Sequence, residues 1–380
     1  MDIRFKPTLQ VIAYSRAARG ILYTFDLERL KWQFMSRSKT RFDDYVQQME
    51  EKVFDNVENA FQHVTAVSRS KNERCLEVKP KVTKQLAGVA MTLALEVKNW
   101  YQCHRHILRA SNLYLRRKLI WFSFGIIDRF KTAQNFVQDE KLDIFERFHL
   151  ACKYYFESDL KMLWENMSVD NKAKIKERVP DRSLEIHLRV LQRNGTIDWD
   201  QLSLTERTGH FFTDNCMGLR YYFPKLKGRI IKSRCIDVAT SCIGIHHFDL
   251  YSCLSGMEMY EINYILGRLK SSNVFVIFNT FLHWPLQNMF LNFAINFMPY
   301  IGPDVFHDLI QIMLFEKIEI GWQDSQYIDL LKSLCMRMPA KYVDHIKKDT
   351  KNYSVLKRVL KNPRPFNLEE YRRYIDNYRR

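Results

Sequence analysis

Apolar residues recur at steps of three and four along most of the chain, which is the spacing of one buried helical face. The clearest run covers residues 42–64, and another begins at Leu9, directly after Pro7 and Thr8. A further helix is expected over about residues 86–115. This pattern predicts an all-α protein.

From residue 139 the pattern changes, and four segments can be laid over one another. Each contains an apolar helix that ends near a methionine, a short polar or proline-containing turn, and the start of a second helix. The aligned residues Met167, Met257, Met298 and Met338 are 90, 41 and 40 residues apart. A two-helix repeat of about 40–45 residues is typical of HEAT-like stacks. We therefore predict stacked helical hairpins over residues 139–362, although ordinary helix lengths in any all-α protein would also give such spacings.

The sequence predicts five regions. Residues 68–84 are rich in lysine, contain Pro80 and show no apolar period, which indicates a linker. The expected order is N-terminal helices at 1–67, a linker or exposed loop at 68–84, a helical connector at 85–138, helical-hairpin repeats at 139–362 and a basic C-terminal cap or tail at 363–380. The predicted fold is an N-terminal helical region followed by an α-solenoid-like stack.

Three segments of the chain resemble a large, lineage-expanded family of uncharacterised spider proteins. They are IIDRFKTAQNFVQDEKLDIFERFHLACKYYFESDLKMLWENMS at 126–168, and the later segments HWPLQNMFLNFAINFMPYI and FEKIEIGWQDSQYIDLLKSLC. Members of that family are similar to this chain along most of their length and are regarded as divergent α-helical repeat proteins. The resemblance implies a helical-repeat architecture, but no activity and no site residues.

The composition agrees with helices joined by short loops. Hydrophobic residues make up 46% of the chain, whereas its 12 Gly and 10 Pro are too few for the tight turns of a β-sandwich or barrel. The eight cysteines include no CxxC pair, which favours free thiols in a reducing compartment. Residues 1–10 lack the apolar segment of a secretory signal. We expect an intracellular protein, cytoplasmic or nuclear, without a signal peptide.

The net charge of +16 is concentrated at the two ends. Residues 1–131 contain 24 Lys and Arg against 13 Asp and Glu, and residues 340–380 contain 12 against 5. Basic ends can bind nucleic acid, an anionic membrane or an acidic protein, or they can keep the chain soluble. In residues 347–380 aromatic residues alternate with the basic ones, which fits contacts to a phosphate backbone and stacked bases. We favour a last amphipathic helix that caps the repeats, because terminal repeats need a polar outer face.

Residues 271–303 contain no charged side chain and, at 33 residues, are long enough to cross a bilayer. Pro285 and Pro299 divide this segment into shorter helices, and its asparagines would be costly in hydrocarbon. We therefore expect a buried central layer of the helical stack and no membrane span.

Two clusters of cysteine and histidine have the composition of metal ligands. In the first, a continuous helix would separate the outermost residues by about 27 Å, which is too far for one ion. In the second, the two histidines would point about 200° apart on a helix. We expect buried structural roles and no metal. The first cluster contains Cys235, Cys242, His246 and Cys253, and the second contains Cys103, His104 and His106.

The chain lacks the G-x-S-x-G, H-E-x-x-H, G-x-x-x-x-G-K-[ST] and G-x-G-x-x-G motifs. The sequence therefore identifies no catalytic, cofactor-binding or metal-binding residue, and we expect no cofactor. Our first hypothesis is a non-enzymatic helical-repeat scaffold that binds an unidentified protein partner. The alternative is binding of nucleic acid or an anionic surface through the basic N-terminal third and C-terminal tail. A third hypothesis is an enzyme whose site forms between the two halves of the chain.

Overall fold

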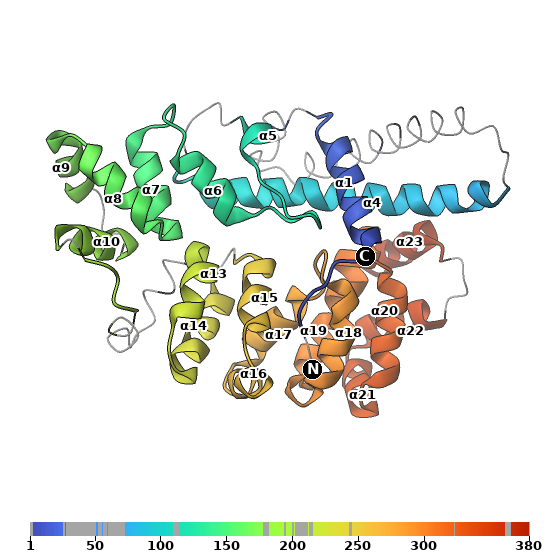
Figure 1. Ribbon diagram of the computed structural model, residues 1–380. Helices are drawn as coiled ribbons and strands as arrows, with labels where there is room; N and C mark the ends of the chain where they lie inside the picture. Colours follow the sequence, from blue (N-terminus) through green and yellow to red (C-terminus); the bar gives the residue numbers. More distant parts are fainter. Residues whose placement is uncertain are drawn as a thin grey trace. The chain divides into compact units, whose positions relative to one another are not determined.

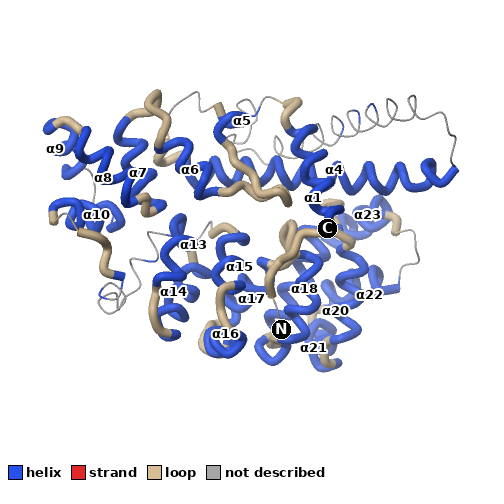
Figure 2. Tube along the Cα trace, in the orientation of Figure 1, coloured by secondary structure: helices blue, strands red, loops and turns tan. Residues whose placement is uncertain are grey.

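The structure, a computed structural model, consists of helices and loops (Figures 1 and 2). Within the residues it describes there is no β-strand, and Trp121 and Ile127 form one isolated bridge. The prediction of an all-α fold is confirmed. The described residues are 3–25, 27, 51, 55, 59, 73–108, 114–177, 182–193, 195–199, 201, 212, 216–242, 245–322, 324–361 and 366–379.

The chain forms two compact units, each assembled from separate stretches of sequence. Unit 1 comprises Met1–Lys6, Glu50–Thr92 and Leu266–Arg380, and unit 2 comprises Pro7–Met49 and Leu93–Ile265. The boundary after Ile265 lies inside the predicted repeat region, so one continuous stack over residues 139–362 stays a prediction.

Unit 2 is built from short helices that pack against their neighbours in the chain. Helix α7 contacts α6, α8 and α10, and α13 contacts α15. The helices are α1 (Leu9–Leu22), the second part of α4 (Glu73–His104), α5 (Leu115–Lys118), α6 (Arg129–Val137), α7 (Ile144–Tyr154), α8 (Glu157–Asn166), α9 (Val169–Glu177), α10 (Arg182–Gln192), η1 (Cys216–Gly218), α13 (Leu219–Tyr222), η2 (Phe223–Lys225), α14 (Arg229–Ser241), α15 (His247–Ser255) and α16 (Met259–Leu266).

Side-chain caps fix where several of these helices begin. The Thr8 hydroxyl accepts the N–H of Val11 at 3.3 Å, so α1 begins at Leu9 as the sequence predicts. Asp128 and Asp143 cap α6 and α7 in the same way. Because each cap satisfies an amide that has no partner inside its helix, the cap stabilises that helix start by about 1 kcal/mol.

The N-terminal third differs from the predicted organisation at α4. Residues 73–84, expected in a linker, are already helical, and residues 68–72 lie outside the described part. Glu, Lys and Arg are good helix formers, so a segment without an apolar face can extend a helix that has one. The helix expected over residues 86–115 ends at His104. The helix predicted over residues 42–64 lies outside the described residues, apart from positions 51, 55 and 59.

In unit 1, alternate helices pack on one another, as consecutive hairpins do in a helical stack. Helix α17 contacts α19, α19 contacts α21, and α18 contacts α20. These helices form the orange to red part of Figure 1. They are α17 (Ser271–Thr280), α18 (Gln287–Asn296), η3 (Met298–Tyr300), α19 (Pro303–Gln311), η4 (Ile312–Ile318), α20 (Tyr327–Arg337), α21 (Ala340–Lys348), α22 (Thr350–Lys361) and α23 (Leu368–Arg379).

A helix, a short turn and a second helix are present at each of the four aligned methionines, whereas their packing as repeated hairpins stays a prediction. Met167, Met257, Met298 and Met338 lie one or two residues after the last residue of α8, α15, α18 and α20, respectively. In each case the next α-helix begins two to five residues later. The methionines that follow α8, α15 and α20 are buried.

The uncharged residues 271–303 form much of the core of unit 1. Phe278, Phe281, Phe290 and Phe293 are completely buried, and the rings of Phe281 and Phe293 stack with centroids 4.0 Å apart. As expected, the segment is divided at its prolines into the ten-residue helices α17 and α18. Most of its apolar residues are buried but Asn288, Asn292 and Asn296 are exposed, so a wholly buried central layer of a stack stays a prediction. Across the part of the chain that the structure describes, no helix combines the length and the apolar character needed to cross a membrane.

Candidate functional site

Helix α19 continues directly into η4, which is a π-helix. The N–H of Glu319 donates to the carbonyl of Leu314, five residues earlier, at 3.0 Å. Such wide turns are rare in proteins and occur frequently at functional sites, because the extra residue redirects the side chains around it. The surface around η4 is therefore a candidate binding site.

A groove of about 470 Å³ is lined by side chains from α17, α19 and η4. Half-buried Phe275, Ile312 and Phe315 give it apolar surface. Half-buried Asp308 and exposed Glu316 also line it. This surface, completed by Gln311, is called the η4 groove below. It places apolar surface and two carboxylates within one recess.

The C-terminal helix α23 packs against η4 and holds it. The hydroxyl of Tyr371, a completely buried side chain, donates to the carbonyl of Leu314 at 3.2 Å. Arg372 donates from Nε to the carbonyl of Glu319 at 2.8 Å and from Nη2 to that of Ile320 at 2.7 Å. Carbonyls at a helix end have no partner within the helix, so Arg372 stabilises this end. The capping of a repeat stack by this helix, which we favoured from the sequence, stays a prediction.

Gly321 allows α23 to come this close. Its backbone has φ +87°, a conformation that residues with a Cβ rarely adopt. A Cβ at this position would lie 2.9 Å from Cδ2 of Leu368 and 3.2 Å from Nη2 of Arg372. The amides of Gly321 and Trp322 both donate to the carbonyl of Lys317 and so close the helix. Glycine at position 321 therefore permits both the backbone conformation and the close contact with α23.

A buried polar cluster lies next to η4 in unit 1. Nε2 of Gln287 donates to Oδ2 of Asp324 at 2.7 Å, and the hydroxyl of Tyr327 donates to the same oxygen at 3.3 Å. Burial raises the pKa of Asp324, against the charge of Lys317, and burial lowers the pKa of Lys317. Shifted pKa values often mark active sites. Here the side chains of Gln287 and Asp324 are only 4% and 5% exposed, so the cluster joins helices and is closed to a substrate.

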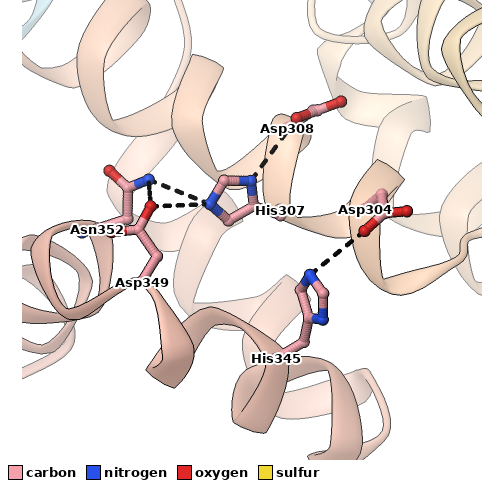
Figure 3. Close-up of polar contacts among 6 residues, drawn as sticks. All are labelled: Asp304, His307, Asp308, His345, Asp349 and Asn352. Atoms are coloured by element: carbon pink, nitrogen blue, oxygen red, sulfur yellow. Dashed lines mark hydrogen bonds and ion pairs between the residues drawn. The ribbon is translucent and has the colours of Figure 1, made fainter.

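Two histidine–carboxylate pairs connect α19 with the hairpin that follows α20 (Figure 3). Nε2 of His307 lies 3.4 Å from Oδ2 of Asp349, and Nε2 of His345 lies 3.3 Å from Oδ1 of Asp304. Nδ2 of Asn352 lies 3.1 Å from the ring of His307. Burial acts to raise the pKa of Asp349, but hydrogen bonds from Asn352 and His307 and the charge of His307 outweigh burial and lower it. These pairs stabilise the contact of α19 with α21 and α22.

Unit 2 contains a buried polar network around Glu96. Its carboxylate lies 2.9 Å from Nε2 of His246 and accepts the N–H of Ile127 at 3.3 Å. Nδ1 of His246 accepts the N–H of Phe248, so the ring proton is on Nε2 and points to Glu96. Burial raises the pKa of Glu96, although the charge of Arg129 opposes this. The network joins α4, the segment before α6 and the start of α15.

The structure does not bring the predicted cysteine–histidine clusters together as ligand sets. Cys235 lies in α14, Cys242 follows its last residue and His246 precedes α15, so the stripe is interrupted. His104 is buried, with Nε2 2.7 Å from the hydroxyl of Tyr154 and Nδ1 bonded to a carbonyl of α4. Burial lowers the pKa of His104 to about 3. Among the side chains that could be searched, no group of three or more is arranged to hold a metal ion.

A smaller recess of about 240 Å³ lies in unit 2. Arg16 and Arg19 of α1 line it together with Trp121, Phe122 and Ser123 of the loop before α6. Two guanidinium groups beside aromatic rings suit an anionic ligand. This recess belongs to the basic N-terminal third that the charge distribution identifies.

The residues of the η4 groove were not predicted from the sequence. A π-helix has no recognised residue pattern, and Phe275 is distant in sequence from Phe315. One signal is present: residues 309–315 contain six apolar residues in seven, more than a single buried face of a helix requires. Such a run indicates a second apolar surface, here the groove.

Known proteins give no guide to these sites. The resemblance to the spider family therefore stays an expectation. Comparison of the chain with models of protein families found no match, and comparisons with curated proteins and with solved structures found none either.

Proposed function

We propose that this chain is a non-enzymatic binding protein that takes a segment of a partner protein into the η4 groove. The supporting observation is the recess of about 470 Å³ in which Asp308 and Glu316 accompany half-buried apolar side chains. Apolar surface in a recess is favourable to cover, and carboxylates beside it select a basic partner. The partner segment would contain an aromatic or aliphatic residue close to Lys or Arg.

The contacts that hold η4 against α23 favour binding of a partner in the groove. Tyr371, Arg372 and Gly321 fix η4 against α23, so little conformational freedom remains to be lost when a partner binds. The six lining residues include no Ser, Cys or His that could act as a nucleophile or a histidine base. A scaffold of helical hairpins is a common source of such surfaces.

A peptide library displayed on phage tests this proposal directly with the full chain as bait. We expect the enriched peptides to share an aromatic or aliphatic residue within one helical turn of Lys or Arg. Reversing both charges, Asp308→Lys with Glu316→Lys, should weaken binding of these peptides at least about tenfold, since like charges oppose binding by more than 1.4 kcal/mol. Fluorescence anisotropy with labelled peptides measures the affinities.

The matched control is Asp170→Lys, which reverses an exposed carboxylate on α9 in unit 2. This variant should bind the peptides as well as the wild type does. Equal affinity of the wild type and the double variant, or enrichment of peptides without a basic residue, would contradict the proposal.

The arginine-lined recess supports a second candidate function, binding of an anionic surface or nucleic acid. Arg16 is exposed and Arg19 is half-buried, and both line the recess. The tyrosines of α23 favour it less, because Tyr371 and Tyr374 are engaged in packing and hydrogen bonds. Binding to heparin that weakens linearly with the logarithm of the salt concentration would support this function. The double variant Arg16→Gln with Arg19→Gln should then be retained less than the wild type. Unchanged retention of the double variant would show that the recess does not bind the anionic ligand.

We also propose that the protein resides in a reducing compartment inside the cell, the cytoplasm or the nucleus. The seven cysteines whose side chains are described are all free thiols, which supports this location. Imaging of a fluorescent fusion in the source cells would test it, and secretion of the fusion would refute it.

A further inference from the structure

The arginine-lined recess of unit 2 is built on a tight turn between α5 and α6. The N–H of Phe122 donates to the carbonyl of Ile126 at 2.8 Å, and the N–H of Gly125 donates to that of Phe122 at 3.1 Å. Gly125 has φ +83°, and a Cβ at this position would lie 3.0 Å from Oγ of Ser15. The turn therefore lies directly against α1, so that its aromatic residues and the arginines of α1 line one recess.

Contacts with neighbouring residues fix the two aromatic rings that line the recess. Nε1 of Trp121 donates to the hydroxyl of Tyr23 at 2.8 Å. The ring of Phe122 stacks on that of Phe124 with centroids 5.2 Å apart, and the ring of Phe248 lies 5.7 Å from it. The indole of Trp121 is half-buried and stacks on no other aromatic ring among the described residues. It can therefore take a flat ring of a ligand.

Four guanidinium groups surround these rings. The two arginines of α1 line the recess itself. Cζ of Arg116 in α5 lies 5.4 Å from the ring centroid of Tyr23, and Cζ of Arg220 in α13 lies 5.0 Å from that of Phe122. Within the part of the chain that the structure describes, none of the four has an ion pair with a carboxylate. The seven residues that line the recess include no acidic one, so the recess attracts anions.

We propose that this recess is a nucleotide subsite for single-stranded nucleic acid. A base stacks on the indole of Trp121, and the phosphates on either side of this base pair with the surrounding guanidinium groups. A guanidinium group matches a phosphate well, because two parallel N–H groups can donate to two phosphate oxygens. The proposal rests on the second candidate function above and specifies the ligand.

The combination of a flat ring with several positive charges selects this ligand among anions. A phospholipid headgroup supplies phosphate but no ring that could stack on Trp121. A phosphorylated tyrosine supplies a ring but a single phosphate, whereas four guanidinium groups suit several phosphates. In a duplex the bases stack on one another and are closed to the indole. Proteins that bind single strands combine positive charge with aromatic side chains in this way.

Fluorescence anisotropy of the full chain with a labelled oligothymidylate of about ten nucleotides tests the proposal. An abasic oligomer and a duplex of the same length are the comparison ligands. We expect the oligothymidylate to bind at least about fivefold more tightly than the abasic oligomer, because a stacked base contributes at least this factor. It should also bind more tightly than the duplex. Equal affinity for the oligothymidylate and either comparison ligand would overturn the proposal, as would binding to phosphatidylserine vesicles without binding to the oligothymidylate.

Two substitutions of Trp121 test the stacking. Trp121→Leu keeps apolar bulk but removes the aromatic face, so affinity for the oligothymidylate should fall at least about fivefold. Its affinity for the abasic oligomer should stay unchanged, which also shows that the variant is folded. Trp121→Phe keeps a flat ring and loses only the hydrogen bond to Tyr23, so it should retain most of the affinity. An equal loss in the two variants would overturn the assignment of Trp121.

The salt dependence of binding tests the charges. Each phosphate contact with a single strand contributes about 0.7 to the slope of log affinity against log salt, so Arg16→Gln with Arg19→Gln should lower the slope by about 1.4. The control Arg189→Gln with Arg193→Gln removes two exposed arginines, one in α10 and one directly after it. It should leave the slope unchanged. An equal decrease in the control would overturn the proposal, because overall charge would then explain the binding.

Retention on heparin depends on charge and not on bases, so the failure of this inference differs from the failure of the second candidate function. If the Arg16 and Arg19 double variant loses retention on heparin while the abasic oligomer binds as tightly as the oligothymidylate, the anion-binding function stands and the nucleotide subsite is refuted. If neither heparin nor oligothymidylate binding depends on these arginines, both are refuted.

Discussion

Replacement of Tyr371 by alanine tests whether α23 holds the π-helix η4 in place. The side chain is completely buried, and its hydroxyl donates to the carbonyl of Leu314 at 3.2 Å. Removing a buried aromatic ring costs about 3–5 kcal/mol, and the lost hydrogen bond adds about 1 kcal/mol. Since 1.4 kcal/mol corresponds to a factor of ten, the opening of α23 should become at least about a hundredfold more favourable.

Amide hydrogen exchange of the full chain, followed by mass spectrometry, measures this opening segment by segment. We expect faster exchange in α23 and also in η4, because η4 loses its contact with the tyrosine. Tyr371→Phe keeps the ring and loses only the hydroxyl, so its effect should stay near 1 kcal/mol, below about tenfold in exchange. Tyr260→Ala, at an exposed tyrosine of unit 2, should change neither segment.

Two results would refute this reasoning. If exchange in α23 accelerates while η4 stays protected, then α23 rests on η4 without supporting it. If Tyr371→Phe is as damaging as Tyr371→Ala, the hydroxyl carries the stability and the packing of the ring does not.

Three further substitutions probe other contacts. The lowered pKa of Asp349 gives the folded protein stability that is present above the ordinary pKa of the carboxyl group and is lost as pH falls through the lowered value. In Asp349→Asn the urea midpoint should therefore fall less steeply with decreasing pH below about pH 4 than it does in the wild type. Parallel curves for the two proteins would contradict this. Glu96→Ala should lower the free energy of unfolding by about 2–4 kcal/mol, since His246 and a backbone amide lose their acceptor, whereas Glu96→Gln should cost less than half as much in urea titrations. Gly218→Ala should destabilise by about 1–3 kcal/mol, because its Cβ would meet a carbonyl oxygen at 2.7 Å; an unchanged melting temperature would disprove that contact.

Local patterns predicted the type of structure well but the buried faces less well. The helix that begins at Leu9 is present, yet Leu9 itself is 85% exposed while Val11, Ser15 and Ala18 are buried. Ser15 is buried because Gly125 approaches α1 closely: a Cβ on Gly125 would lie 3.0 Å from the Ser15 hydroxyl. Only a small residue fits at this position. The requirement comes from Gly125, which is distant in sequence, so the local pattern around Ser15 does not show it. Periodicity finds a helix, whereas tertiary contacts decide which side it buries.

The candidate sites depend on contacts between residues far apart in sequence. Tyr371 reaches Leu314 across 57 residues, and no short pattern at either position indicates that bond. The hairpin turns, in contrast, were located through aligned methionines, because a turn and its helix ends are local.

The division of the sequence between the units also sets the order in which they can fold during synthesis. Unit 2 is complete once residue 265 has left the ribosome, whereas unit 1 needs residues up to α23. At typical elongation rates the remaining residues take on the order of ten seconds. During that interval the phenylalanines of residues 271–303 emerge before the helices that cover them. The nascent chain thus exposes a long uncharged segment, and transiently exposed apolar surface of this kind promotes aggregation.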